Sequence, residues 1–199
     1  MNRTFYFVRH GQTDHNLKRI SQDAFTVLDD TGNKQAENLG RRLHSVSFET
    51  LVCSHYVRAQ QTALHVAESS GHKPVVQELF GEVRNPSVMA NRSYQDPDII
   101  RIVDERFAHW HDPNYRYEDG ENYFDVCERA DEALRWLLSD TKGDCAVVTH
   151  GTFLRILVGT VLFEGPDPKR DLLLRKHMPI SNTGISIAKH DGRTWAFYH

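Results

Sequence analysis

The sequence predicts an α/β protein of three layers, in which helices cover both faces of a mostly parallel central sheet. Short apolar runs rich in β-branched and aromatic residues alternate along the chain with segments whose apolar residues recur at helical spacing. Such alternation is typical of strands that pair in parallel through helical crossovers. The last two apolar runs are separated only by a turn at Asp191-Gly192, which predicts that the sheet ends in an antiparallel hairpin.

The first half of the chain alternates regularly. Its expected elements are a strand over 4–9, a short turn over 16–21, a helix over 32–43, a strand over 50–53, a helix over 57–68 and a strand over 73–77. In the first of these helices Ala36, Leu39 and Leu43 fall on one face, which is the face expected to pack on the sheet. Gly71 marks the end of the second helix.

The second half interrupts this alternation before it resumes. Residues 84–121 contain three prolines, many charges and several aromatic residues, and we interpret them as an inserted cap over the functional site. The elements expected after the cap are a helix over 124–138, a strand over 145–149, a helix over 152–162 and hairpin strands over 184–190 and 194–198. No repeat or low-complexity linker divides the chain, so we expect a single domain over residues 1–199.

Composition narrows the classes of function. The 199 residues carry a formal net charge of -3 with dispersed cations, which argues against nucleic acid as a partner. No stretch approaches the roughly 20 apolar residues of a membrane span, and the N-terminus runs directly into the first strand, so we expect a cytoplasmic protein without a membrane partner. The cysteines at 53, 127 and 145 cannot all pair within one chain and are expected to be reduced.

The segment Phe5 to Gly11 is the first candidate for a functional site. Its apolar run ends at Arg9 and His10, so a cation and an imidazole stand at the carboxyl end of a strand, where open α/β sheets usually bind ligands. Arginine suits phosphate oxygens, and Gly11 lets the backbone bend so that its N–H groups face an anion. Taken alone, such a tripeptide is more often a polar strand end.

Three further segments support the functional interpretation. The four segments, in chain order, are Arg9-His10-Gly11 followed by Asn16, Ser54 followed by Arg58, Gly81-Glu82, and His150-Gly151. Together they resemble the motifs of the histidine phosphatase superfamily, also called phosphoglycerate-mutase-like, from residue 4 to about residue 190. Because glycine rather than aspartate follows His150, the chain resembles the mutase and small-phosphatase branch and not the acid phosphatases and phytases. The resemblance implies a phosphoglycerate-mutase-like fold.

The resemblance also implies roles in phosphoryl transfer. His10 would be the nucleophile that forms a phosphohistidine, and Arg9, Arg58 and His150 would hold the phosphoryl oxygens. Glu82 would act as acid and then base, with Glu78 as an alternative. Further substrate-binding residues would be Asn16, Gly11 and Gly151. No metal or other cofactor is expected, because the cations replace a metal ion and the twelve histidines match no tetrahedral ligand pattern.

Three functions remain open from the sequence. The first is a phosphomonoesterase acting on a small phosphorylated substrate, because the chain is short for the glycolytic mutases of the family and residues 84–124 lack their substrate-clamping stretch. The second is a phosphoglycerate mutase, and the third is a non-catalytic phospho-ligand-binding module. The arginines of the cap either recognise a second anion or form surface ion pairs. A homodimer is an expectation that rests on the family alone.

Overall fold

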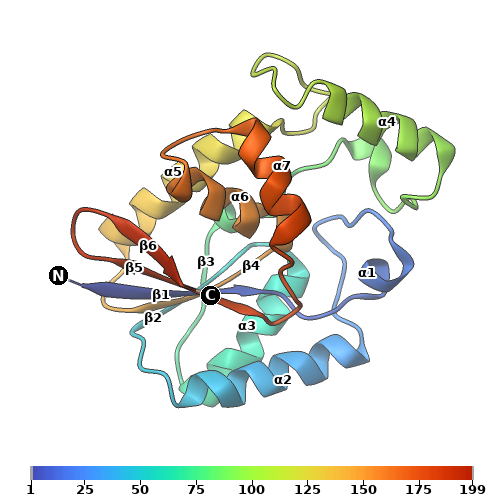
Figure 1. Cartoon of the computed structure of the whole chain (residues 1–199). Coiled ribbons are helices and arrows are strands. Elements are labelled where there is room, and N and C mark those ends of the chain that lie inside the picture. The colour runs from blue at the N-terminus through green and yellow to red at the C-terminus, as the bar shows by residue number, and fades with distance from the viewer. Residues whose placement is uncertain (1, 199) are drawn as a thin grey trace.

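A six-stranded sheet with the order β3-β2-β4-β1-β5-β6 forms the centre of the computed structural model, which describes residues 2–198 (Figure 1). The strands are β1 (Arg3–Arg9), β2 (Thr50–Cys53), β3 (Val75–Val76), β4 (Cys145–Thr149), β5 (Ile185–His190) and β6 (Trp195–Tyr198). The first four run parallel, whereas β5 pairs antiparallel with both β1 and β6. The predicted α/β class, the mostly parallel sheet and the antiparallel end are confirmed.

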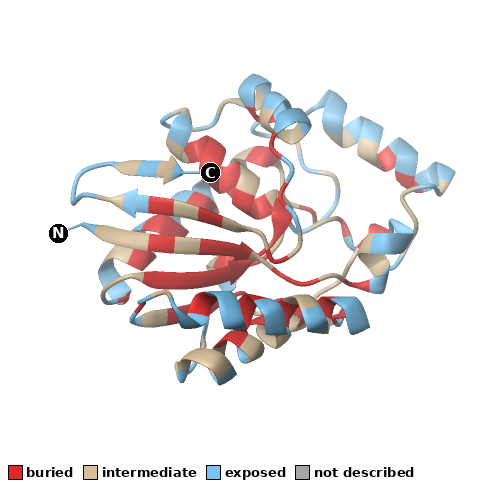
Figure 2. Ribbon diagram, turned by 60° about the horizontal axis from the view of Figure 1, so that its bottom comes forward, coloured by how far each residue is buried: buried red, intermediate tan, exposed pale blue. Residues whose placement is uncertain are grey.

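Helices cover both faces of the sheet (Figure 1). The covering helices are α2 (Asp30–His44) and α3 (Val57–Ser70) on one face, and α5 (Tyr123–Asp140) and α6 (Gly151–Leu162) on the other, with α7 (Pro168–His177) packed on α6. Successive strand side chains point to opposite faces, so Phe5 and Phe7 of β1 pack toward α5 and α6 whereas Val8 packs toward α2 and α3. Figure 2 shows the buried residues concentrated in the strands and on the inner sides of these helices.

The cap predicted over 84–121 contains its own helix. It consists of the 3-10 turn η2 (Ser87–Met89), helix α4 (Pro97–Ala108) and loops, and it buries a separate small cluster of Met89, Ile99 and Ile102. α4 lies at the upper right in Figure 1, apart from the central sheet. Asp96 accepts a hydrogen bond from the Asp98 N–H, and Pro97 occupies the first turn, so the helix starts with two common N-terminal features.

Three local expectations need correction. No helix was expected over residues 97–108 or 168–177, where α4 and α7 lie. Both follow an Asp-Pro pair, which combines an N-cap with a proline in the first turn. The turn expected over 16–21 is instead the short helix α1 (Asp14–Lys18), because Thr13 and Asn16 form a reciprocal capping box that starts it earlier.

The remaining expectations about composition concern cysteines, membranes and metals. All three cysteines are free and buried, as predicted. Within residues 2–198, no helix combines the length and apolar character needed to cross a membrane. Over the same residues, the His, Cys, Asp and Glu side chains form no group of three that could hold a metal ion.

Candidate active site

The carboxyl ends of β1 and β4 bring the two histidine motifs together. Arg9 pairs in register with Thr149, and the His10 N–H donates to the Thr149 carbonyl at 2.9 Å. His10 and His150 follow these adjacent parallel strands, and their ring centroids are 5.1 Å apart. A cavity of about 400 Å³ opens at this point, with the cap forming part of its wall. The site therefore lies at the sheet edge that the sequence indicated.

His10 is held in one neutral tautomer by two hydrogen bonds. Its Nδ1 lies 2.7 Å from the Gly11 carbonyl oxygen, which can only accept, so Nδ1 carries the proton. Arg58 Nε donates to His10 Nε2 at 3.2 Å, so Nε2 holds the lone pair. Burial and the charge of Arg58 keep the pKa of His10 well below its usual value, against the smaller opposing effect of the bond to Gly11. Nε2 is therefore an unprotonated nitrogen beside a cation.

Arg58 is a buried cation without a carboxylate partner among residues 2–198. It lies in the first turn of α3 and is 1% exposed. A second guanidinium nitrogen donates to the Asp23 carbonyl at 2.8 Å, and the group lies 4.8 Å from the centre of the Tyr56 ring. Burial lowers its pKa to about 10, so it stays charged at neutral pH. A buried guanidinium that meets only neutral partners is suited to an anionic ligand.

Arg9 enters the cavity from the end of β1. One terminal guanidinium nitrogen donates to the Ile180 carbonyl at 2.6 Å, whereas its Nε is buried and has no partner among the described residues. Its side chain passes over Gly151, where an added Cβ would lie 3.3 Å from Arg9 Cδ. Gly151 thus gives Arg9 room at the start of α6, and both residues line the cavity.

His150 is fully buried behind the cavity wall. Its Nε2 pairs with Ser54 Oγ at 2.8 Å, and its Nδ1 has no partner within residues 2–198. Burial, with the charge of Arg58, lowers its pKa well below the usual value, so the ring is neutral. The structure places His150 beside His10 and in contact with Ser54, and contact of His150 with a phosphoryl oxygen stays a prediction.

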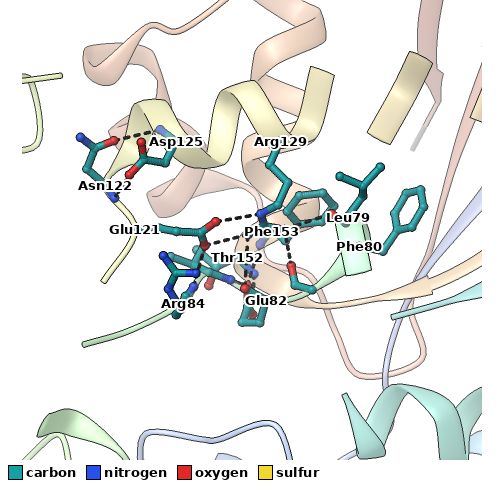
Figure 3. Close-up of polar contacts among 12 residues, drawn as sticks. Leu79, Phe80, Glu82, Arg84, Glu121, Asn122, Asp125, Arg129, Thr152 and Phe153 are labelled. Carbon is teal, nitrogen blue, oxygen red and sulfur yellow. Dashed lines mark hydrogen bonds and ion pairs between the residues drawn. The ribbon is translucent and has the colours of Figure 1, made fainter. Parts of the chain in front are cut away.

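Glu82 faces the cavity from the loop that follows the 3-10 turn η1 (Glu78–Phe80), and the cavity lining includes Glu82 but not Glu78. Its carboxylate accepts hydrogen bonds from the backbone N–H groups of Thr152 at 3.2 Å and Phe153 at 2.8 Å, as Figure 3 shows, and from Val83 at 2.9 Å. The first two belong to the first turn of α6, where the helix dipole favours negative charge. The geometry favours Glu82 over Glu78 as the acid.

Gly11 and Asn16 were both expected to bind substrate, but of these two residues Asn16 alone lines the cavity. The Gly11 N–H donates to Thr62 Oγ1 at 3.1 Å, so it is engaged within the protein instead of facing an anion, and the Gly11 carbonyl oxygen accepts from His10 Nδ1. A side chain at Gly11 would also collide with the Gly32 carbonyl oxygen, 2.6 Å from the Cβ position. Asn16 lines the cavity, and because its Oδ1 accepts from the Thr13 N–H, the amide N–H group is directed elsewhere. Asn16 therefore stays a candidate donor to substrate.

Comparison with known proteins identifies the family. The family model of the histidine phosphatase superfamily (branch 1) matches residues 5–199. The chain belongs to this superfamily. It is 28% identical to a protein of Erwinia tasmaniensis named as a probable phosphoglycerate mutase, covering 96% of this chain and 86% of that one. It is 26% identical to a broad-specificity phosphatase of Saccharomyces cerevisiae, covering 93% and 78% of the two chains.

Solved structures agree with this assignment. YhfR of Bacillus stearothermophilus is 29% identical, with a TM-score of 0.78 over 97% of this chain and 94% of that one. The alpha-ribazole phosphatase of Shigella flexneri is 20% identical and has a TM-score of 0.80 over 98% and 95%, which shows a shared fold. This histidine phosphatase homologue is therefore an enzyme of the phosphatase and mutase class.

Arg129 of α5 holds the loop that carries Glu82, a role the sequence analysis did not assign. Its guanidinium donates to the backbone carbonyls of Leu79 at 3.0 Å, Gly81 at 2.8 Å and Glu82 at 3.3 Å. It also forms a two-point ion pair with Glu121, at 2.8 Å for each contact (Figure 3). Both side chains are largely buried. In this histidine phosphatase homologue, Arg129 of α5 therefore fixes the position of the loop that carries Glu82, the candidate acid.

Sequence reasoning also missed part of the cavity wall. Besides the predicted residues, and besides Arg106 and Trp110 of the cap, whose contact with substrate the sequence left open, the wall includes Tyr94, Phe107, Arg155 and Arg175. The sequence could have placed Arg155 at the site, because it lies four residues after Gly151 on a predicted helix and therefore on the same helix face. Arg175 had no such pattern, since α7 itself was not predicted.

Acid should destabilise this phosphatase homologue through its buried histidines. The folded state lowers the pKa values of His10 and His150, so below about pH 6.5 the unfolded chain binds protons that the folded chain excludes. Stability is then fully present above pH 6.5 and lost as the pH falls, by about 1.4 kcal/mol per pH unit for each histidine. Denaturant unfolding between pH 7.5 and 5 measures this slope. His10→Gln should reduce it by about 1.4 kcal/mol per pH unit, and an unchanged slope would contradict the prediction.

Proposed function

We propose that the protein is a metal-independent phosphomonoesterase that acts on small phosphorylated substrates through a phosphohistidine on His10. The observation that carries the proposal is the state of His10 Nε2: an unprotonated, desolvated nitrogen 3.2 Å from the Arg58 Nε, at a cavity that Glu82 also lines. A nucleophile, cations for the equatorial oxygens and an acid for the leaving oxygen are the requirements of phosphoryl transfer.

The first half of the reaction transfers the phosphoryl group to the protein. The lone pair of His10 Nε2 attacks phosphorus, the bond from phosphorus to the ester oxygen breaks, and protonated Glu82 gives its proton to the departing alkoxide. For this lone pair to become available, Arg58 first turns its Nε–H from His10 to a phosphoryl oxygen, and Arg9 offers its unpartnered Nε to another. The Gly11 carbonyl holds the Nδ1 proton and disperses the positive charge that develops on the ring.

The second half returns the protein to its starting state. The Glu82 carboxylate takes a proton from water, the water oxygen attacks phosphorus, and the bond from phosphorus to Nε2 breaks to release inorganic phosphate. Microscopic reversibility requires the same carboxyl to act in both halves. A cavity of about 400 Å³ leaves space for water after the alcohol departs.

A phosphoglycerate mutase is the second candidate, because the relative in Erwinia tasmaniensis bears that name. A mutase would retain the phosphohistidine and return the phosphoryl group to bound product instead of water. A binding module without catalysis is the third candidate. The joint presence of His10, His150, Arg9, Arg58 and Glu82 at one site argues against it, since a site without chemistry has no need of the whole set.

The test measures phosphate release from a panel of phosphomonoesters in the presence of a chelator, with phosphoglycerate isomerisation followed in parallel. We expect hydrolysis that resists the chelator and disappears in His10→Ala, and an acid-labile phosphoryl group on His10 after rapid quenching. Isomerisation faster than hydrolysis would replace the proposal by the mutase. Phosphate binding without turnover of any ester would favour the binding module.

Arg129→Gln should slow the reaction by loosening the Glu82 loop. A misplacement of about 1 Å can cost about 100-fold in rate, so we expect kcat for an alkyl phosphate to fall by about 10- to 100-fold with little change in KM. The phosphorylation step with 4-nitrophenyl phosphate, followed by stopped-flow release of 4-nitrophenolate, should slow less than 3-fold because this leaving group needs no proton. Arg135→Gln is the matched control, since this exposed arginine of α5 forms its ion pair with Asp131, away from the Glu82 loop. Equal losses on both esters would contradict positioning of the acid.

A further inference from the structure

The cavity carries more positive charge than a phosphoryl group requires. Its wall contains one carboxylate, that of Glu82, and six arginines, which are Arg9, Arg19, Arg58, Arg106, Arg155 and Arg175. A phosphoryl dianion held by Arg9 and Arg58 balances two of these charges. The guanidinium of Arg175 is balanced by the buried Asp171 at 3.1 Å. Within residues 2–198, Arg19, Arg106 and Arg155 line the cavity without an ion-pair partner.

Arg155 is the most informative of these cations. Within residues 2–198, its side chain forms neither a hydrogen bond nor an ion pair, and its Nε is buried without a partner. Burial lowers its pKa, and the neighbouring charge of Arg175 lowers it further. Leaving a buried N–H donor of a guanidinium unpaired is costly. Because Arg155 lines the cavity, a ligand can supply the missing acceptors.

Arg106 is the one cap arginine on the cavity wall. Of the other cap arginines, Arg92 and Arg101 pair with aspartates of the cap, Arg116 pairs with Asp125, and Arg84 donates to the Asp119 carbonyl at 2.9 Å. Arg106 instead meets neutral partners, the Asn85 side-chain oxygen at 2.8 Å and the Glu121 carbonyl at 3.2 Å. It is therefore positioned by the protein without being neutralised.

Arg175 and two aromatic rings complete the wall. Arg175 lies 4.4 Å from the centre of the Trp110 ring and 5.2 Å from that of Phe107, so the rings and the Asp171 ion pair fix its position. Its charge lowers the pKa values of both Arg106 and Arg155, and all three side chains line the same cavity. Arg106 and Arg155, each beside Arg175 on the wall of one cavity and neither paired with a carboxylate within residues 2–198, favour binding of an anion.

The spacing of residues along α6 sets how far Arg155 lies from the end of the cavity that contains Arg9. Gly151 lies under Arg9 at the phosphoryl end, and Arg155 follows one helical turn later on the same face. Four residues of helix rise about 6 Å. A second anion on Arg155 therefore lies a short carbon skeleton away from the phosphorus atom.

We propose that Arg155 and Arg106, with Arg175 beside them, form a second anion site, so that the preferred substrate is a short phosphomonoester whose alcohol carries a carboxylate or a second phosphate. This inference rests on the proposed function, since it assigns the substrate class of the same cavity. Phe107 and Trp110 cover the carbon skeleton between the two anions.

Matched pairs of esters test the proposal. 3-Phosphoglycerate is compared with glycerol 3-phosphate, which replaces the carboxylate by a hydroxymethyl group, and fructose 1,6-bisphosphate with fructose 6-phosphate. We expect the doubly anionic member of at least one pair to show the higher kcat/KM by 10-fold or more. The pair with the larger ratio identifies the second anion as carboxylate or phosphate. Ratios near one in both pairs, with hydrolysis proceeding, would overturn the second site and leave the phosphatase proposal intact.

Variants assign the effect to the named arginines. Arg155→Gln and Arg106→Gln should each lower kcat/KM for the doubly anionic ester by about 10- to 100-fold, mainly through KM, as expected for loss of a charge-assisted hydrogen bond. Glycerol 3-phosphate should change by less than 3-fold. Arg101→Gln, which alters an exposed cap arginine outside the cavity, is the control and should change neither. Equal losses on both members of a pair would contradict a specificity role.

A binding measurement separates failure of the second site from failure of catalysis. Calorimetric titration of the His10→Ala variant with 3-phosphoglycerate and with glycerol 3-phosphate needs no turnover. Tighter binding of 3-phosphoglycerate by 10-fold or more, lost on adding Arg155→Gln, supports the site even if the wild type hydrolyses no ester. The same titrations with the fructose esters cover the second phosphate. Equal affinities in both pairs would overturn it regardless of activity.

Discussion

His10→Ala should lower the rate of phosphate release by at least about 10⁴-fold, the loss typical of removing a catalytic nucleophile. Without the imidazole no covalent intermediate forms, and water would have to displace the alcohol in one step. The arginines remain, so binding of inorganic phosphate should weaken by less than 10-fold. Single-turnover measurements on a reactive ester, together with phosphate titration, separate these two effects.

A control variant is needed to show that His10→Ala does not act by unfolding the protein or by a general disturbance of the cavity wall. His15 lines the same cavity but lies on α1, where its Nε2 contacts Asn91 at 3.2 Å. His15→Ala should keep the rate within about 10-fold of the wild type. Equal losses in the two variants would show that any histidine removed from the cavity wall disturbs the site, and the nucleophile would have to be sought elsewhere. Thermal unfolding of both variants checks that the fold persists.

The strand-end motifs could be predicted because parallel strands end at one edge of a sheet. Arg9 is the last residue of β1, and His10 and His150 directly follow β1 and β4, which pair with each other. Short-range sequence patterns were therefore enough to place these residues together. Glu82 depends on a loop, and its position results from long-range contacts with the first turn of α6 and with Arg129. Neither contact leaves a local pattern in the sequence.

The parts that could not be predicted are those governed by tertiary contacts. α7 buries only Asp171, so its apolar residues do not show the helical spacing on which the prediction of helices relied. Gly11 was expected to bend toward an anion, whereas close backbone approach to Gly32 and the hydrogen bond to Thr62 explain its environment. The pairing of the cap arginines likewise depends on side-chain geometry that the sequence does not encode locally.

Glu82→Gln should have an effect that depends on the leaving group. Loss of a general acid costs about 10²- to 10⁴-fold for an alkoxide, which needs a proton to depart. With 4-nitrophenyl phosphate, the substitution should slow the phosphorylation step by less than about 10-fold. Stopped-flow absorbance of the released 4-nitrophenolate measures this step. Inorganic phosphate release from an alkyl ester gives the other measurement. The contrast between the two esters, rather than either rate alone, identifies the proton donor.

The same pair of esters decides between the two candidate acids. Glu78→Gln alters the carboxyl of η1, which does not line the cavity, and should leave both rates within about 3-fold. Glu82→Gln also places an amide N–H group among backbone donors, including the Thr152 N–H, so its stability should fall by about 1–3 kcal/mol. A stability loss affects both esters equally, whereas loss of the acid does not. If Glu78→Gln showed the dependence on leaving group and Glu82→Gln did not, the proton would reach the alcohol by a route that this cavity does not provide, and the assignment of Glu82 would have to be abandoned.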